Sequence, residues 1–231
     1  MGTGNGSWVI PPGKDENPPN PPPGHHANGA CLRVTRLNTP IGSMVAGATD
    51  AGLWFLTFVD DLPDVDGPSH DDSPSGDDPA SPTSSHGDSL LSSLPQIPRF
   101  RQRFGLPIAP GPHPHLERLQ DELARYFAGA LRRFSVPVVL HGTAFQQAVW
   151  RQLCRIPYGE TRSYQELAQA VHRPRAVRAV GQANARNPIA IVVPCHRILR
   201  KDGDLGGYAA QPWRKRYLLD LEKRVRSVHR H

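Results

Sequence analysis

Hydrophobic and polar positions change their spacing several times along the chain. Short β-like runs occupy positions 32–35, 41–48 and 52–59. The turn Asp50-Ala51-Gly52 separates the last two runs and is typical of a hairpin. The run Val-Pro-Val-Val-Leu at 136–140 predicts another strand, which its proline confines to a sheet edge.

A helical period occupies residues 115–134, between the run at 52–59 and the run at 136–140. Apolar side chains there recur at intervals of three and four, which predicts one amphipathic helix. They are Leu116, Leu119, Leu123, Phe127 and Leu131.

Two capping boxes predict helix starts in the second half of the chain. In each, a hydroxyl residue precedes a Glu or Gln by three positions, so that side chains and backbone can satisfy each other at the helix start. We expect helices at about 144–155 and 164–171. The pairs are Thr143 with Gln146, and Ser163 with Glu166.

A third helix is expected to begin near Pro174 or Arg175. The turn before it contains His172-Arg173-Pro174, and its inner face carries one small and three larger residues at helical spacing. Two short helices joined by a tight turn favour a helix-turn-helix. The inner-face residues are Val177, Val180, Gly181 and Asn184.

Composition divides the 231 residues into ordered and unordered stretches. The 25 prolines are unevenly placed, and residues 1–30 are expected to form a disordered Pro/Gly-rich tail. A Pro, Ser and Asp stretch at about 60–95 predicts a disordered acidic insertion. The expected domains are therefore a small α/β domain at 31–140 and a mainly α domain at 141–225, with a basic tail at 226–231.

Charge is strongly polarised. Residues 60–88 contain nine Asp and no Lys or Arg, whereas residues 141–231 carry 17 Lys and Arg against six Asp and Glu. Such a basic segment is typical of a surface that meets a polyanion such as DNA. No run of about 18 apolar residues occurs, so we expect a soluble, cytoplasmic protein that does not enter a membrane.

The sharpest chemical feature is the segment Ile191-Val192-Val193-Pro194-Cys195-His196-Arg197. An apolar, strand-like run would hold the thiol inside the fold, and adjacent cations would stabilise a thiolate. Cys195 is thus a candidate nucleophile, although most free cysteines are small buried hydrophobic residues. Neighbouring side chains diverge, so His196 would need a water molecule to reach the sulfur.

The motif Pro194-Cys195-His196-Arg197 resembles the active-site signature of the O6-alkylguanine-DNA alkyltransferases, also called methylated-DNA-protein-cysteine methyltransferases. The resemblance extends from Gly142 to Glu222. Other matching motifs are Phe145 to Trp150, Ile156-Pro157-Tyr158-Gly159-Glu160, Ser163-Tyr164, Arg178-Ala179-Val180-Gly181, Asn187-Pro188 and Gly206-Gly207-Tyr208.

The resemblance implies roles in catalysis. Cys195 would accept the alkyl group once and irreversibly, His196 would act as a water-mediated base, and Glu222 would orient His196. Asn187 would hold the active-site loop, and Tyr164 would give a proton to the leaving base.

The resemblance also implies a DNA complex. The substrate would be O6-alkylguanine, and also O4-alkylthymine, flipped out of double-stranded DNA. Arg178 would take the base's place, and Ala176, Ala179 and Gly181 would let the helix at about 175–185 approach the minor groove. Further expected contacts are Gln165, Arg173 and Lys201, with Tyr208 as a wall of the base-binding site.

The fold implied is a ribonuclease-H-like α/β domain, suggested by Asn38 to Ser43 and Gly52-Leu53, followed by a winged-helix-like helix-turn-helix domain. We expect a monomer that needs no cofactor. Cys154 is interpreted as a core residue. His25, His26 and Cys31 are three clustered possible ligands, two of them in the Pro-rich tail, so no zinc site or other metal is expected.

Two other functions stay open at this point. A non-enzymatic module could recognise alkylated DNA, but related proteins of that kind lack the acceptor cysteine. A turnover cysteine hydrolase could use Cys195 and His196, but it would have no need of a basic surface.

Overall fold

The computed structural model describes residues 31–60, 97–205 and 211–228. The expected tail at 1–30 and nearly all of the expected acidic insertion lie outside these residues. The elements, in chain order, are β1 (Leu32–Thr39), β2 (Gly42–Thr49), β3 (Gly52–Phe58), α2 (Ile97–Phe104), β4 (Ile108–Pro110), α3 (Pro114–Phe127), α4 (Ala144–Cys154), β5 (Arg162–Ser163), α5 (Tyr164–Ala170), α6 (Val177–Ala185), the 3₁₀ helix η1 (Cys195–Arg197), β6 (Ile198–Leu199) and α7 (Pro212–Val228).

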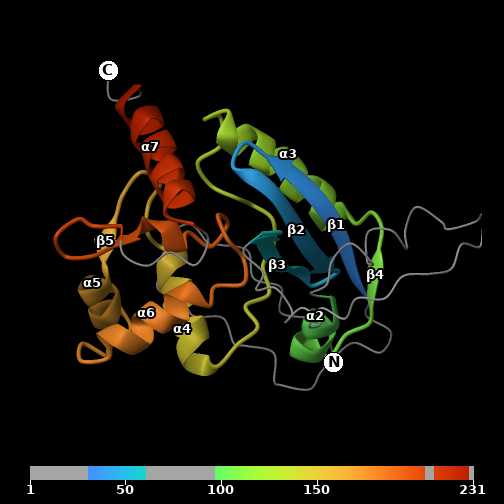
Figure 1. The fold of residues 1–231 in the computed structure, drawn as a ribbon, viewed down its shortest axis with the longest axis horizontal. Coiled ribbons are helices and arrows are strands. Elements are labelled where there is room, and N and C mark those ends of the chain that lie inside the picture. Colours follow the sequence, from blue (N-terminus) through green and yellow to red (C-terminus); the bar gives the residue numbers. More distant parts are fainter. Residues whose placement is uncertain (1–30, 61–96, 206–210, 229–231) are drawn as a thin grey trace, which may run out of the picture.

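The first half of the chain builds a mixed four-stranded sheet of order β3-β2-β1-β4. β1, β2 and β3 pair antiparallel, whereas β4 runs parallel to β1. The hairpin predicted at Asp50-Ala51-Gly52 is confirmed, because Thr49 of β2 pairs with Gly52 of β3. Figure 1 shows this sheet beside α2 and α3, with α4 to α7 grouped on the other side of the molecule.

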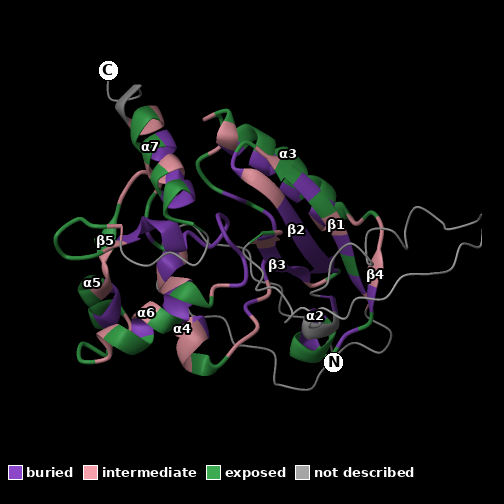
Figure 2. Cartoon of the chain, viewed as in Figure 1, coloured by how far each residue is buried: buried purple, intermediate pink, exposed green. Residues whose placement is uncertain are grey.

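Alternate residues of a strand point to opposite faces of a sheet. Here both faces are covered, and each belongs to a different core. Met44 and Ala46 of β2 belong to the larger core, which also contains the apolar side of α3. Val45 belongs to a smaller core, in which Phe55 of β3 stacks on Phe100 of α2 at 4.2 Å between ring centroids. β2 and β3 are accordingly almost entirely buried (Figure 2).

The segment at 136–140 lies at the sheet edge, as predicted, but it forms one parallel bridge, between Val138 and Leu53, and no continuous strand. The approach to β3 is close. Gly52 has a φ of +132°, and a Cβ there would lie 2.7 Å from the carbonyl oxygen of Pro137. Glycine fits both the backbone angle and the space.

The helix predicted at 115–134 is shorter than expected, since α3 ends at Phe127. The chain reverses through Gly129, whose φ of +74° suits the left-handed end of a helix. The buried carboxylate of Glu122 then accepts hydrogen bonds from the backbone of Ser135 and Val136, which fixes the returning chain. Leu131 still packs on the core, but from outside the helix.

Both predicted capping boxes are present, at the starts of α4 and α5. α6 begins at Val177, later than predicted. In a longer helix, the carbonyl of Pro174 would accept a backbone hydrogen bond from the next turn of that helix. Here it accepts a hydrogen bond from the side chain of Gln165 at 3.1 Å. Beside these helices, β5 and β6 form a short parallel pair. α7 continues to Val228, so the start of the expected basic tail is helical.

Candidate active site

Cys195 begins η1 directly after Pro194 and is buried, with 6% of its surface exposed. The preceding residues were expected to be strand-like, but they form tight turns. Ile191 has a φ of +69°, and Cys195 donates its backbone N–H to the carbonyl of Val193 at 2.8 Å. The run nevertheless holds the thiol inside the fold, as the sequence suggests.

Two sets of contacts hold this segment in place. The backbone of Leu56, on edge strand β3, bonds to Pro188 and Ala190 at 2.9 and 2.8 Å. The Asn187 amide donates to the carbonyl of Val193 at 2.8 Å and accepts from the N–H of Ile189 at 3.0 Å. Asn187 therefore makes the bonds that a loop-holding residue requires.

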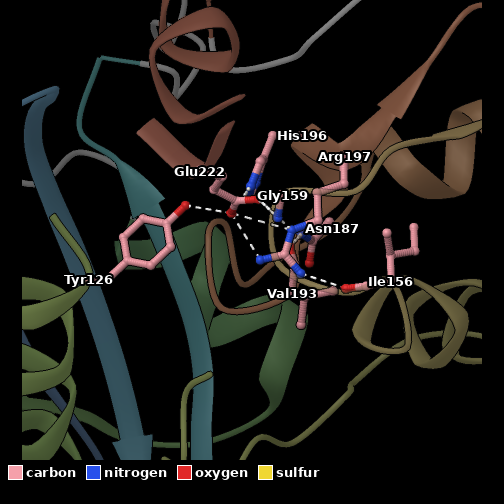
Figure 3. Close-up of polar contacts among 8 residues, drawn as sticks. All are labelled: Tyr126, Ile156, Gly159, Asn187, Val193, His196, Arg197 and Glu222. Carbon is pink, nitrogen blue, oxygen red and sulfur yellow. Dashed lines mark hydrogen bonds and ion pairs between the residues drawn. The ribbon is translucent and has the colours of Figure 1, made fainter. Parts of the chain in front are cut away.

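His196 and Glu222 are hydrogen-bonded, with 3.0 Å between Nε2 and Oε1 (Figure 3). Both side chains are buried, at 0% and 1% exposure. Burial lowers the pKa of His196 despite the opposing charge of Glu222, so the imidazole is held neutral. Its other nitrogen, Nδ1, is buried and has no hydrogen-bond partner among the described residues. A neutral imidazole with one nitrogen fixed by a carboxylate can accept a proton on the other.

Three further groups converge on Glu222. Arg197 donates from Nε and Nη2 at 2.9 Å, Gly159 donates its N–H at 2.9 Å, and Tyr126 donates its hydroxyl at 2.7 Å. Burial alone would raise the pKa of Glu222, but His196 and Arg197 outweigh it and hold that pKa well below its ordinary value. The carboxylate is therefore firmly ionised.

Arg197 was predicted to stabilise the thiolate of Cys195, but its side chain contacts other groups. The contacts of its guanidinium lead to Glu222 and to the carbonyl of Ile156, at 2.6 Å from Nη1. Its charge thus stabilises the carboxylate.

Tyr164 opens α5 and faces Gly181 of α6, where a Cβ would lie 3.8 Å from the tyrosine ring. Burial raises the pKa of Tyr164, and Cys195 raises it further, while Arg200 and Asn184 oppose them. Tyr164 is therefore a protonated phenol within electrostatic range of the thiol.

The expected DNA contacts gather around α5, α6 and the loop after β6. Gly181 is half-buried on α6, and Tyr208 lies outside the described residues. The exposed ones are Gln165, Arg173, Arg178 and Lys201.

Sequence reasoning missed Lys215, Tyr126 and the carboxylate-binding role of Arg197. Lys215 is fully buried on α7 and donates to the carbonyls of Ile198 and Leu205. Burial lowers its pKa to about 8, against the opposing influence of Cys195 and Asp204. Lys215 precedes Glu222 by seven residues, so the two side chains lie on one face of α7. That spacing was a signal available in the sequence.

The remaining cysteines differ from Cys195. Cys154 packs partly buried against the core, and burial raises its pKa to about 12. Cys31 is partly exposed. His25 and His26 lie outside the described residues, and within the described ranges no three His, Cys, Asp or Glu side chains cluster to hold a metal. None of the described helices is long and apolar enough to cross a membrane.

Comparison with known proteins matches the second half of the chain to one family. A family model described as "6-O-methylguanine DNA methyltransferase, DNA binding domain" matches residues 144–224. Methylated-DNA–protein-cysteine methyltransferases of Methanosarcina barkeri and Mycobacterium tuberculosis are 53% and 57% identical over 102 and 103 residues. These alignments cover 44% and 45% of this chain and 65% and 62% of the two relatives. The aligned segment is thus less than two thirds of each relative's length.

Solved structures extend the likeness to the first half of the chain. A crystal structure of Mycobacterium tuberculosis OGT in complex with DNA is 35% identical, with a TM-score of 0.59 over 84% of this chain and 94% of that one. The O6-methylguanine-DNA methyltransferase of Pyrococcus kodakaraensis shares the fold at 22% identity, with a TM-score of 0.52 over 83% of this chain and 98% of that one. The chain therefore belongs to the 6-O-methylguanine DNA methyltransferase family.

Proposed function

We propose that this chain repairs DNA by moving the alkyl group of O6-alkylguanine, and also of O4-alkylthymine, onto the sulfur of Cys195. The observation that carries the proposal is the buried pairing of His196 with Glu222 directly beside Cys195. A neutral imidazole oriented by an ionised carboxylate is the base that a thiol needs in order to become a nucleophile.

The reaction would begin with proton removal. The thiol proton of Cys195 passes through one water molecule to Nδ1 of His196, the nitrogen that Glu222 leaves open. The charge of Glu222 stabilises the imidazolium that results. The thiolate is then ready to attack without any cofactor.

Transfer would follow as an in-line displacement at the alkyl carbon. The S–C bond forms while the C–O6 bond breaks, and the electron pair of that bond remains on guanine. Tyr164, whose raised pKa keeps it protonated, gives the departing base a proton and regains one from solvent. The product is a thioether, which nothing in this chemistry reverses, so each molecule reacts once.

DNA binding would use α5 and α6. The alkylated base must leave the duplex to meet a buried sulfur. We place α6 in the minor groove, where half-buried Gly181 and the exposed Ala179 permit close approach, and Arg178 in the position of the flipped base. Tyr208 would form one wall of the base-binding site. Other contacts would come from Gln165, Arg173 and Lys201.

We further infer a ribonuclease-H-like domain at 31–140 and a winged-helix-like domain at 141–225. The mixed sheet with α3 on one face supports the first assignment, and the β5–β6 pair beside α5 and α6 supports the second. The protein would act as a monomer inside the cell, where its DNA substrate lies.

Intact-protein mass spectrometry with peptide mapping tests the proposal. The protein is mixed with duplex DNA that contains one O6-methylguanine. We expect a single added methyl on Cys195 that saturates at one per molecule. Tight binding with unchanged mass would point to a damage sensor, and product released beyond one equivalent would point to a turnover hydrolase.

A further inference from the structure

Tyr126 connects the first half of the chain to the catalytic carboxylate. It lies near the end of α3, well before the matched residues 144–224, and its side chain is fully buried. Its hydroxyl donates to Oε1 of Glu222 at 2.7 Å (Figure 3). A residue outside the catalytic half therefore contacts the group that orients His196.

The two oxygens of Glu222 are bound differently. Oε2 accepts from Gly159 and from Nε of Arg197, both at 2.9 Å. Oε1 accepts from Tyr126, from Nη2 of Arg197 at 2.9 Å and from His196 at 3.0 Å. Tyr126 and His196 thus share one oxygen, so a change in one bond must change the other.

The surroundings keep Tyr126 both protonated and fixed. Burial raises its pKa well above the ordinary value, and Glu222 raises it further, so the hydroxyl remains a donor. Its ring packs against Phe127, Phe134 and Tyr158, at 5.4, 5.3 and 5.9 Å between centroids. Such packing leaves the hydroxyl little freedom to turn away.

We propose that Tyr126 is a positioning residue for the alkyl transfer described above, on which this inference rests. Its hydroxyl fixes Oε1 of Glu222 and draws negative charge away from the bond to His196. The imidazole is therefore held in place without being made so basic that it keeps a proton. His196 stays neutral, with Nδ1 ready to accept the proton of Cys195.

The other groups that act on His196 or lie beside its partners are not altered in the test variant. Arg197 on η1 and Lys215 on α7 both lower its pKa, whereas Glu222 raises it. Tyr158 packs beside Arg197, at 5.7 Å from the guanidinium carbon to the ring centroid. Removing the Tyr126 hydroxyl leaves all four in place, so its effect on His196 can be read separately.

The test compares Tyr126→Phe with Tyr158→Phe. Each variant loses one buried hydroxyl from neighbouring rings, but the Tyr158 hydroxyl has no hydrogen-bond partner among the described residues. The first measurement is an NMR titration of the His196 imidazole in the full chain without DNA. The second is the single-turnover rate of methyl transfer from duplex DNA between pH 5 and 8, with the DNA dissociation constant as a control.

For Tyr126→Phe we expect the His196 midpoint to rise by about half a pH unit, because Glu222 becomes a stronger acceptor for the imidazolium. The acid limb of the rate profile should move up with it, and the maximal rate should fall about fivefold. DNA affinity should not change. Tyr158→Phe should behave as the wild type in every measurement.

Equal His196 midpoints in the two variants would overturn the inference, and so would a loss of thermal stability in Tyr126→Phe with no movement of the pH profile. The titration requires no reaction, so it separates this inference from the proposed function. A wild-type chain that takes up no methyl group would overturn the proposed function and, with it, the part that Tyr126 plays in transfer. The wild-type rate of methyl transfer is therefore measured before the rates of the two variants.

Discussion

The imidazole of His196 and the carboxylate of Glu222 meet at 3.0 Å although 26 positions separate them in the chain. The first stands on η1 and the second on α7, so the packing of α7 against the Cys195 segment assembles the pair. Because neither side chain is exposed, solvent does not screen their interaction. The pairing occupies Nε2 of His196, while Nδ1 has no hydrogen-bond partner among the described residues.

Cys195→Ala should abolish methyl transfer and leave DNA binding intact, because the variant loses the nucleophile and no surface group. The matched control is Cys154→Ala. Burial raises the pKa of the Cys154 thiol to about 12, so it remains a protonated, unreactive thiol and the variant should transfer normally. Transferred methyl is measured by mass spectrometry, and DNA binding by fluorescence anisotropy. Methylation that persists in Cys195→Ala would show that the acceptor lies elsewhere.

Glu222→Gln should destabilise the protein at pH 7 by about 3–5 kcal/mol, because it leaves the buried charge of Arg197 without its partner. The folded pKa of Glu222 lies well below its ordinary value of about 4.3, so the unfolded chain takes up the proton first as the pH falls. The wild type therefore loses this contribution progressively below about pH 4.5, whereas the variant has nothing to titrate there.

Urea denaturation at pH 7 and at pH 4 checks the difference. The gap in unfolding free energy between wild type and Glu222→Gln should be largest at pH 7 and narrower at pH 4. Glu117→Gln, at an exposed position on α3, is the control and should match the wild type at both pH values. A gap of equal size at both pH values would mean that Glu222 does not carry the depressed pKa.

Local sequence patterns correctly predicted the helix starts that depend only on neighbouring residues. The capping boxes at Thr143 and Ser163 begin α4 and α5, because each is complete within four residues. The apolar run before Cys195 looked like a strand, and its turns depend instead on the side-chain clamp from Asn187. A hydrophobic pattern carries no information on such a clamp.

Long-range contacts explain the residues that sequence reasoning missed. Tyr126 reaches Glu222 across 96 positions, and its place in an amphipathic helix gave no sign of a polar partner. Arg197 stands beside Cys195 in the chain, but its guanidinium turns toward Glu222 and Ile156. Adjacency in sequence suggested a contact with the thiol, whereas the fold directs the charge to the carboxylate.

Lys215→Met should slow methyl transfer about tenfold or more. The variant removes the buried donor to the carbonyls of Ile198 and Leu205 and a positive charge within electrostatic range of Cys195. Lys223→Met is the matched control, because Lys223 stands on the same helix but is exposed. Single-turnover rates and thermal melts are measured for both variants. Normal transfer by Lys215→Met would exclude any contribution of this charge to the reaction.

Arg178→Ala should reduce transfer from duplex DNA far more than reaction with free O6-benzylguanine. The free base is already outside a duplex, so it has no need of a side chain to replace it in the stack. Arg178 is exposed on α6, and no hydrogen bond or ion pair joins its side chain to another described residue. We expect a loss of about a hundredfold on duplex DNA, of the order of 2–3 kcal/mol, and about twofold or less on the free base.

Arg118→Ala supplies the charge control for this comparison. Arg118 is exposed on α3, away from α5 and α6, so its loss removes one positive charge and should leave both reactions close to the wild-type rate. Rates are measured at one salt concentration, because phosphate contacts weaken as salt rises. If Arg178→Ala slowed both substrates equally, Arg178 would support the chemistry or the fold, and base flipping would depend on another residue.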